Sequence, residues 1–331
     1  MDLLPNEDQQ QIAEVAGDFL TAELPAGRLR RAPADGPAEV RAAAAMGWLG
    51  MALPEAVGGA GLTVADELMV FREAGRQLIS PSLLATTLAA DLALSAGDKA
   101  LAGEFLAGRP AAFAHPLGEA EADSLDREFL LIDAGAADHV LVWTAQAIAL
   151  ARAPRQGRQP GAGIDDALTY ERLRLDGGSL IARSQTMGPA ALRGRILAAA
   201  MLVGMAQATR DMASEYAKVR QQFGRAIGGF QAVKHRCANM VVEAECAQAQ
   251  TIFAAAAAAG GREDAPFHSF AAKIMATRAS FANARSNIQV HGAMGFTVEC
   301  DAHWYVKRSH VLDQLGGQAR QRLLLQCPAP V

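Results

Sequence analysis

The stretch YAKVRQQFGRAI (residues 216–227), followed closely by FQAVKH (residues 230–235), separates two long helical patterns and decides how this chain is interpreted. Before it, apolar residues recur at intervals of three, four or seven from Leu197 to Val219, and a second helical pattern runs from Phe230 to about Ala259. Such spacing places apolar side chains along one face of a helix. The stretch is therefore predicted to join two long antiparallel helices of a bundle.

A third helix of the bundle is predicted from another apolar repeat, formed by Phe267, Phe270, Ile274, Phe281 and Ile288. This repeat ends at QVHGAMGFTVE (residues 289–299), where glycines interrupt the helical periodicity. We expect both repeats to line the buried faces of the bundle, with their methionines in the core.

The rest of the chain divides by its periodicity. Residues 1–110 show helical patterns broken by turn signals, and residues 111–187 contain short apolar runs separated by Gly, Pro and Asp, which are typical of strands. Residues 188–331 return to helices. The sequence therefore predicts a mainly α protein with a small β domain: an N-terminal helical domain, an abbreviated middle β domain and a C-terminal four-helix-type bundle.

Composition restricts the class of function. The chain has 331 residues, 51% hydrophobic and only 5% aromatic, with a net charge of −4. This balance gives no basic footprint for nucleic acid or anionic lipid, and the polar, acidic N-terminus lacks the features of a secretory signal. We expect a soluble, cytoplasmic protein that binds neither nucleic acid nor membrane. The four cysteines have no metal-ligand spacing, so buried thiols and no metal site are expected for Cys237, Cys246, Cys300 and Cys327.

Three motifs in this order resemble the acyl-CoA dehydrogenases: an RxxFG turn (residues 220–224), an FQ pair (230–231) and QVHGAMG (289–295), which resembles the family's QxxGGxG loop with Ala293 in place of its second glycine. The order of helices, small β domain and helices is similar to that family as well. The resemblance implies FAD as cofactor, an acyl-CoA thioester as substrate, α,β-dehydrogenation as reaction and an electron-transfer acceptor. In the family these motifs grip the ADP half of an FAD bound mainly to a neighbouring subunit, which implies a dimer, a tetramer or a second family subunit.

The chemistry of the motif residues suits such a ligand. Arg220 is a planar, permanently charged donor for a pyrophosphate, and Gln231 and Gln289 offer both a donor and an acceptor to ribose or adenine. Small residues in the loop leave its backbone amides accessible. The alternative is that Arg220 only caps a helix and the glycines only turn the chain. The resemblance assigns cofactor contacts to Arg220, Phe223, Gln231, Gln289, Gly292 and Ala293.

The catalytic glutamate of the family is missing at both of its usual positions. Counting from Gln289 to the position of the family's YEG-like segment reaches Gly316. The other family position, at the start of the helix before the RxxFG turn, is Gly194. Glycine cannot accept a proton. Asp313 and Glu299 are weaker candidates for a displaced base, since a base shifted by a turn is poorly placed for proton abstraction.

The β domain also lacks flavin-ring motifs. The family's TEPxxGSD-like segment is reduced to AHPLGE (residues 114–119), in which His115-Pro116 is at best a relic, and the later W(I/V)(S/T) strand has no counterpart. The resemblance therefore extends to the ADP side of the FAD site, and neither the ring side nor the base is retained.

Three hypotheses remain open. The chain is the short, glutamate-lacking subunit of a heteromeric acyl-CoA dehydrogenase, whose partner carries the ring site and the base. Alternatively, it is a self-sufficient homo-oligomeric dehydrogenase with a displaced carboxylate, or a non-catalytic structural or binding member of the family. Split enzymes of this family are associated with bulky acyl groups such as steroid side chains, but the acyl group cannot be deduced from this sequence.

Overall fold

The N-terminal part of the chain consists of helices whose starts are fixed by capping side chains. The computed structural model describes residues 4–118 and 124–317. Asn6 accepts a hydrogen bond from the backbone of Gln9, whose side chain accepts one from the backbone of Asn6, and Thr63 and Asp66 form a second capping box. The α-helices of this part are α1 (Glu7–Glu23), α2 (Gly36–Ala45), α3 (Val64–Arg76), α4 (Ser82–Ser95) and α5 (Lys99–Leu106).

A seven-stranded sheet follows, in the order β5-β6-β2-β1-β3-β4-β7. The β1–β3 pair is parallel and the other pairs are antiparallel. The strands are β1 (Ala111–Pro116), β2 (Glu128–Ile132), β3 (His139–Trp143), β4 (Ala147–Arg152), β5 (Gln159–Pro160), β6 (Tyr170–Arg174) and β7 (Leu180–Gln185).

The sheet separates two cores because successive side chains of a strand point to opposite faces. Leu141 and Trp143 of β3 join the main core together with α4, whereas Val140 and Val142 face a smaller core of the β domain. Trp143 therefore points toward the helical parts of the molecule.

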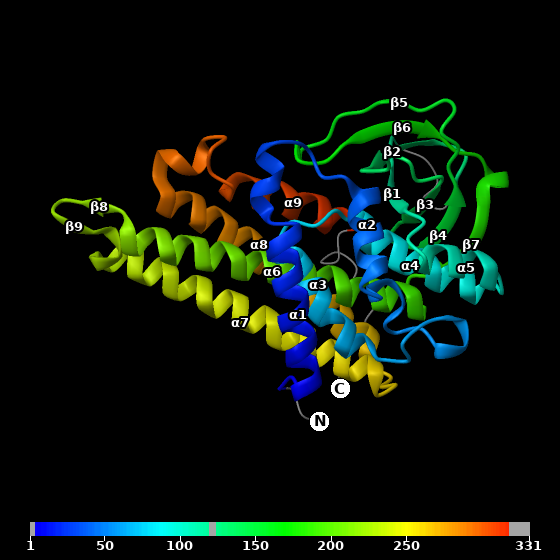
Figure 1. Cartoon of the computed structure of the whole chain (residues 1–331), viewed down its shortest axis with the longest axis horizontal. Helices are drawn as coiled ribbons and strands as arrows, with labels where there is room; N and C mark the ends of the chain where they lie inside the picture. Colours follow the sequence, from blue (N-terminus) through cyan, green and yellow to red (C-terminus); the bar gives the residue numbers. More distant parts are fainter. Residues whose placement is uncertain (1–3, 119–123, 318–331) are drawn as a thin grey trace.

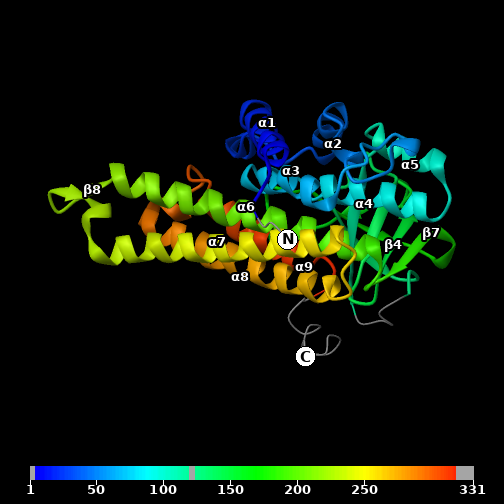
Figure 2. The ribbon, with the colours of Figure 1, turned by 90° about the horizontal axis from the view of Figure 1, so that it is seen from below.

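The C-terminal bundle is formed by long helices that lie side by side in both views (Figures 1 and 2). The β8–β9 hairpin projects from the end of the bundle farthest from the sheet (Figure 1). Helix α6 is crossed by α3 and is buried along most of its length. The helices are α6 (Pro189–Val219), α7 (Gln231–Ala259), α8 (Ala265–His291) and α9 (Ala302–Gln314). This arrangement confirms the predicted mainly α fold with a small β domain.

The buried faces of the bundle differ in part from the predicted ones. On α6, Leu197, Met201 and Met205 are buried as expected, but Val219 is 72% exposed at the end of the helix. On α8 the expected apolar stripe is only partly buried apart from Phe270, and the inner face carries small and polar residues such as Ala276. Small side chains allow the three long helices to approach closely, so the interior selects them over large apolar residues.

Three further expectations concern a membrane-spanning helix, a metal site and the cysteines. Among residues 4–118 and 124–317, α6 alone is long and apolar enough to span a membrane, and 89% of its most apolar window is buried inside the protein. No group of metal ligands occurs within the same residues. The thiols of the described cysteines are free; Cys300 is buried as expected, Cys237 is only partly buried, and the expectation is wrong for Cys246, which is exposed on α7. Cys327 lies outside the described residues.

A buried carboxyl group lies where the sheet meets the N-terminal helices and α9. Asp133 follows β2 with a φ of 51° and is 2% exposed, and Thr169 donates a hydrogen bond to its Oδ1 at 3.1 Å. Burial raises the pKa of Asp133 to about 6. Since this pKa lies above that of the unfolded chain, the folded protein takes up a proton between about pH 4 and pH 6. The contribution of Asp133 to the free energy of unfolding is therefore greatest in acid, and it is lost as the pH rises through 6.

We predict that Asp133→Asn raises the free energy of unfolding at pH 7.5 by about 1 to 3 kcal/mol and changes it little at pH 4.5. The amide keeps the shape of the side chain and tolerates a positive φ, but carries no charge to bury. Urea unfolding of both proteins at the two pH values measures the difference. An equal effect at both pH values would show that ionisation of Asp133 is not the cause.

Candidate functional site

The RxxFG stretch forms a short exposed hairpin at the free end of α6 and α7 (Figure 1). Its strands are β8 (Gln221–Gln222) and β9 (Arg225–Ala226). The two residues between them, Phe223 and Gly224, have positive φ angles of 51° and 78°, as the central residues of a type I′ turn require. Phe223 is 91% exposed at the tip. The turn thus holds an aromatic side chain in solvent.

Arg220 lies at the base of this hairpin with its backbone fixed. Its N–H donates to the carbonyl of Tyr216 at 2.9 Å, and its carbonyl accepts from the N–H of Ile227 at 2.8 Å. The side chain is exposed, and its guanidinium has no hydrogen bond or ion pair with any other described residue. Gln231, the first residue of α7, is exposed as well. Arg220 is the C-cap residue of α6 through its backbone N–H, as the alternative expected, and its guanidinium is available to a ligand.

The QxxGGxG loop ends α8. Gln289 is exposed in the last helical turn, and Gly292 ends the helix with φ 61° and ψ −138°, a region that other residues rarely adopt. Ala293 is exposed in the following 3₁₀ turn. A Cβ at Gly295 would lie 2.8 Å from the carbonyl oxygen of Ile288, so the loop folds tightly back onto α8.

The hairpin and the loop lie at the same end of the bundle, on different helices. A small core beneath them is formed by Ala213, Ala217, Met240 and Val290. Above it, the rings of Tyr216 on α6 and His291 on α8 stack, with centroids 4.1 Å apart. The structure therefore gathers at one end of the bundle the segments that carry the six residues predicted to contact the cofactor. We call this end, with its hairpin and loop, the bundle tip.

The bundle tip is positively charged although the chain as a whole is acidic. Arg220, Arg225, Lys234 and Arg236 are exposed and pair with no carboxylate among the described residues, whereas Lys218 pairs with Glu215. A charged fork donor, two exposed amide side chains and an open glycine loop suit the pyrophosphate and the nucleoside of an ADP group. The residues present therefore fit the ADP half of FAD.

The two positions predicted for the catalytic base meet at one buried indole ring. A Cβ at Gly194 on α6 would lie 2.8 Å from Cη2 of Trp143, and a Cβ at Gly316 would lie 2.8 Å from Cε2 of the same ring. The N–H of Gly316 also donates to the carbonyl of Trp143 at 3.3 Å. Trp143 is 4% exposed. The space between the two positions holds a side chain of the core, so this part of the chain does not fit a flavin ring.

Asp313 and Glu299 are the weaker base candidates. Asp313 lies on α9, and its carbonyl oxygen and that of Leu315 accept hydrogen bonds from the buried ammonium of Lys273, at 3.4 and 2.8 Å. Burial lowers the pKa of Lys273 to about 8. Glu299 is exposed beyond the glycine loop, and a backbone hydrogen bond lowers the pKa of its carboxyl group, the opposite of what a general base needs.

The end of β1 keeps little of a ring-binding segment. His115 is half-buried, and its pKa is lowered by burial and by the nearby charge of Arg127. Arg127 donates to the carbonyl oxygens of Leu117 and Gly118, which holds the chain after β1 against the β domain. The expected relic AHPLGE thus has a structural partner up to residue 118, and residue 119 lies outside the described residues.

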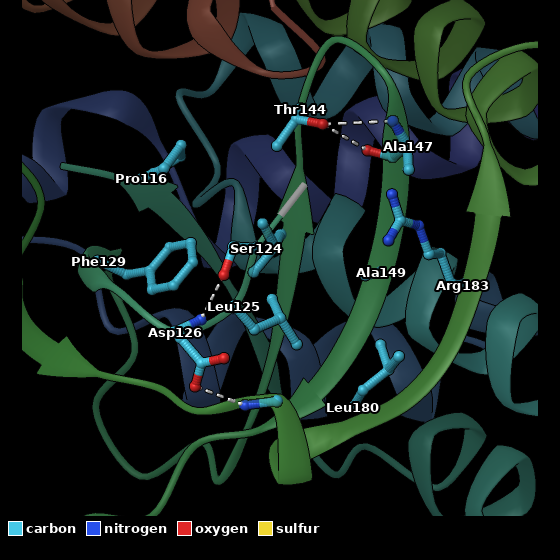
Figure 3. A pocket seen from close by; sticks show the side chains of 12 residues that line it. Pro116, Ser124, Leu125, Asp126, Phe129, Thr144, Ala147, Ala149, Leu180 and Arg183 are labelled. Atoms are coloured by element: carbon cyan, nitrogen blue, oxygen red, sulfur yellow. Dashed lines mark hydrogen bonds between the residues drawn. The ribbon is translucent and has the colours of Figure 1, made fainter. Parts of the chain in front are cut away.

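A cavity of about 200 Å³ opens beside the end of β1 (Figure 3). Its walls include Phe129, Thr144 and Leu180, with Arg183 and Asp126 at its sides (Figure 3). It lies on the face of β3 that carries Val142, opposite Trp143. Small-molecule sites usually measure about 300 to 1,000 Å³. The cavity is too small for a flavin. It also lies on the face of the sheet opposite the Trp143 ring, and so opposite the ring that Gly194 and Gly316 contact.

The distance along α6 separates the two halves of the predicted site. Gly194 and Arg220 stand 26 positions apart on or at the end of one continuous helix, which corresponds to about 39 Å at 1.5 Å per residue. This is longer than an extended FAD molecule. The structure therefore does not bring the cofactor residues of this chain to its own base positions.

We predict that Gly316→Glu destabilises the isolated chain by about 2 to 5 kcal/mol, because any Cβ meets the Trp143 ring and the φ of 77° strains a non-glycine residue. Gly157→Glu is the matched control, since Gly157 has a φ of 86° and open space around it. We expect a cost of only about 1 to 2 kcal/mol there. Urea unfolding measures both, and equal costs would mean that the ring of Trp143 yields freely.

Comparison with known proteins relates both helical parts of the chain to one family. Residues 6–109 match the acyl-CoA dehydrogenase N-terminal domain, and residues 184–324 match the acyl-CoA dehydrogenase C-terminal domain. The chain is 32% identical to acyl-CoA dehydrogenase IpdE2 of Mycobacterium tuberculosis, over 97% of this chain and 96% of that protein.

Solved structures share the fold over nearly the whole chain. A variant of the Tcur3481–Tcur3483 steroid ACAD superposes with a TM-score of 0.78 at 25% identity, covering 96% of each chain. The ChsE4–ChsE5 complex from Mycobacterium tuberculosis gives a TM-score of 0.80 at 24% identity, covering 99% of this chain and all of that one. The chain therefore belongs to the acyl-CoA dehydrogenase family of oxidoreductases.

Proposed function

We propose that this chain is the base-lacking subunit of a heteromeric acyl-CoA dehydrogenase. Its bundle tip would hold the ADP half of an FAD whose ring lies on a partner subunit of the same family. The observation that carries the proposal is the convergence of Gly194 and Gly316 on the buried Trp143 ring, while the cofactor residues stay exposed about 39 Å away.

The residues of the bundle tip would each contribute to binding. Arg220 would donate charge-assisted hydrogen bonds to the pyrophosphate, and Gln231 and Gln289 would pair with polar edges of the ribose or the adenine. The loop at Gly292 and Ala293 would bring its backbone close to the ligand, and Phe223 would give an apolar surface. When bound, FAD supplies the acceptor for the hydride that leaves the substrate.

A homo-oligomer is less well supported than a pair of different chains. In a symmetric dimer each bundle tip would reach a second copy of the same β domain, in which the Trp143 ring again lies between the two glycines. A partner that keeps a glutamate and an open ring site would complete the site. The solved Tcur3481–Tcur3483 steroid ACAD is described by two protein names, which agrees with this arrangement.

The substrate class follows from the family and its relatives. We propose an acyl-CoA thioester from fatty acid or steroid side-chain degradation, oxidised between its α and β carbons at the base of the partner, with an electron-transfer protein as the final acceptor. The chain itself would supply binding and orientation. It would supply no proton acceptor at the α carbon.

Co-expression with a glutamate-bearing family member tests the proposal. We expect the two chains to purify together, to be yellow and to oxidise at least one acyl-CoA from a set of straight-chain and steroid side-chain thioesters. Separate purification of the two chains, with full activity of the partner alone, would refute it.

A further inference from the structure

Tyr216 precedes the RxxFG motif, His291 occupies a variable position of the QxxGGxG loop, and their rings stack between the two motifs. Their ring centroids are 4.1 Å apart and the ring planes differ by 22°. Tyr216 lies one turn before Arg220 on α6, and its carbonyl accepts the N–H of Arg220. His291 is the last residue of α8 and directly precedes Gly292. The stack therefore joins the two turns from which the motifs project.

The orientation of the imidazole ring is fixed from within its own helix. Nδ1 of His291 lies 2.9 Å from the carbonyl oxygen of Asn287. Because a carbonyl oxygen can only accept, Nδ1 is the protonated nitrogen in this contact. The hydrogen bond restrains the imidazole ring, whose plane lies at 22° to that of Tyr216, in a stacked arrangement.

Beneath the stack, the end of α8 is joined to α6 by a small apolar core and by two asparagines: Asn287 donates to Sδ of Met212 at 3.8 Å, and Asn283 donates to the carbonyl of Ala206 at 3.0 Å. The buried core beneath the stack contains Ala213 and Ala217 of α6, Met240 of α7 and Val290 of α8. The alanine side chains offer few contacts that would resist sliding of one helix past the other. The two flat rings supply a broad contact at the level of the ligand-binding turns.

We propose that Tyr216 and His291 are positioning residues that set the separation between Arg220 and the Gly292 loop, and thereby the affinity for the ADP group. This inference rests on the proposed function. A ligand held from two helices binds well only when both sets of donors stand at the right distance before it arrives. The stack supplies this preorganisation without touching the ligand.

A double-mutant cycle in the assembled enzyme tests the role of the pair. We expect Tyr216→Leu and His291→Leu each to weaken FAD binding by about two- to tenfold, the range typical of an aromatic pair. The double variant should bind FAD about as well as either single variant, because the stack is lost only once. FAD titration followed by fluorescence gives the dissociation constants.

A conservative variant separates positioning from general destabilisation. Tyr216→Phe keeps two flat rings and the Nδ1 hydrogen bond of His291, and it should bind FAD within about twofold of the unmodified assembly. Phe253 and His268 form another ring pair, with centroids 4.5 Å apart, near the opposite end of α7. Phe253→Leu should lower the melting temperature but leave the affinity for FAD unchanged.

The outcomes distinguish this inference from the proposed function. If the leucine variants bind FAD as tightly as the unmodified assembly, or if their effects simply add, the pair has no positioning role. Equal losses in Tyr216→Leu and Tyr216→Phe would also overturn it. An unmodified assembly that binds no FAD would overturn both the pair's role and the proposed function.

Discussion

Purified without a partner, the chain should oxidise acyl-CoA thioesters at least about 10²- to 10⁴-fold more slowly than the assembled enzyme, the usual cost of a missing general base. The resemblance predicts the positions of that base at Gly194 and Gly316, and the Trp143 ring fills the space between them. The loss should exceed this range because the ring side of the site is closed as well. A dye-linked assay with straight-chain and steroid side-chain acyl-CoA thioesters measures it.

Variants of the isolated chain sharpen this first prediction. Gly316→Glu restores a carboxylate but should not restore turnover, and neither should Gly316→Glu combined with Trp143→Ala, which makes room for it. Circular dichroism must show that each variant is folded. The opposite result would be robust turnover by the unmodified chain that Asp313→Asn abolishes. It would mean that the base has moved to α9 and that the chain is self-sufficient.

Arg220→Ala should weaken FAD binding to the assembled enzyme by roughly ten- to a hundredfold. A charge-assisted hydrogen bond of a guanidinium typically contributes about 1.5 to 3 kcal/mol, and the exposed Arg220 guanidinium is paired with no other described residue. Binding of FAD therefore does not have to break an existing ion pair of Arg220. Titration of the flavin-depleted assembly with FAD measures the change.

A matched control removes an arginine away from the bundle tip. Arg278 on α8 is exposed and pairs with Glu243 across the helix surface. Arg278→Ala should leave FAD affinity unchanged, since an exposed ion pair contributes little. If Arg220→Ala and Arg278→Ala have the same small effect at low FAD concentration, Arg220 is not a pyrophosphate ligand.

The fold could be predicted from the sequence because its signals are local and repeated. Helical spacing before and after the residue 216–227 stretch, and short apolar runs such as the one at β3, are each visible within a few turns of chain. The buried face of α8 was harder to predict from the sequence. Its apolar stripe marks a partly exposed side, and the interior prefers Ala276 and other small residues, because close helix packing depends on three helices at once.

The site could be predicted only in part, for a similar reason. Motif order points to Arg220 and Gln289, and the resemblance predicts that the carboxylate of the base is missing at Gly194 and Gly316. The space between the two glycines is filled by Trp143, which is 51 positions from Gly194 and 173 from Gly316 in the sequence. No short pattern joins residues so far apart. The same holds for Tyr216 and His291, which meet only once α6 and α8 are packed.

The flavin content of the purified proteins tests the central claim most directly. We predict that the isolated chain is colourless, and that its complex with a glutamate-bearing family member carries one FAD for every two chains and loses it on dialysis when this chain carries Arg220→Ala. Absorbance of the released flavin against protein concentration gives both ratios. An isolated chain that binds one FAD per chain, and whose flavin is bleached by an acyl-CoA, would contradict the claim.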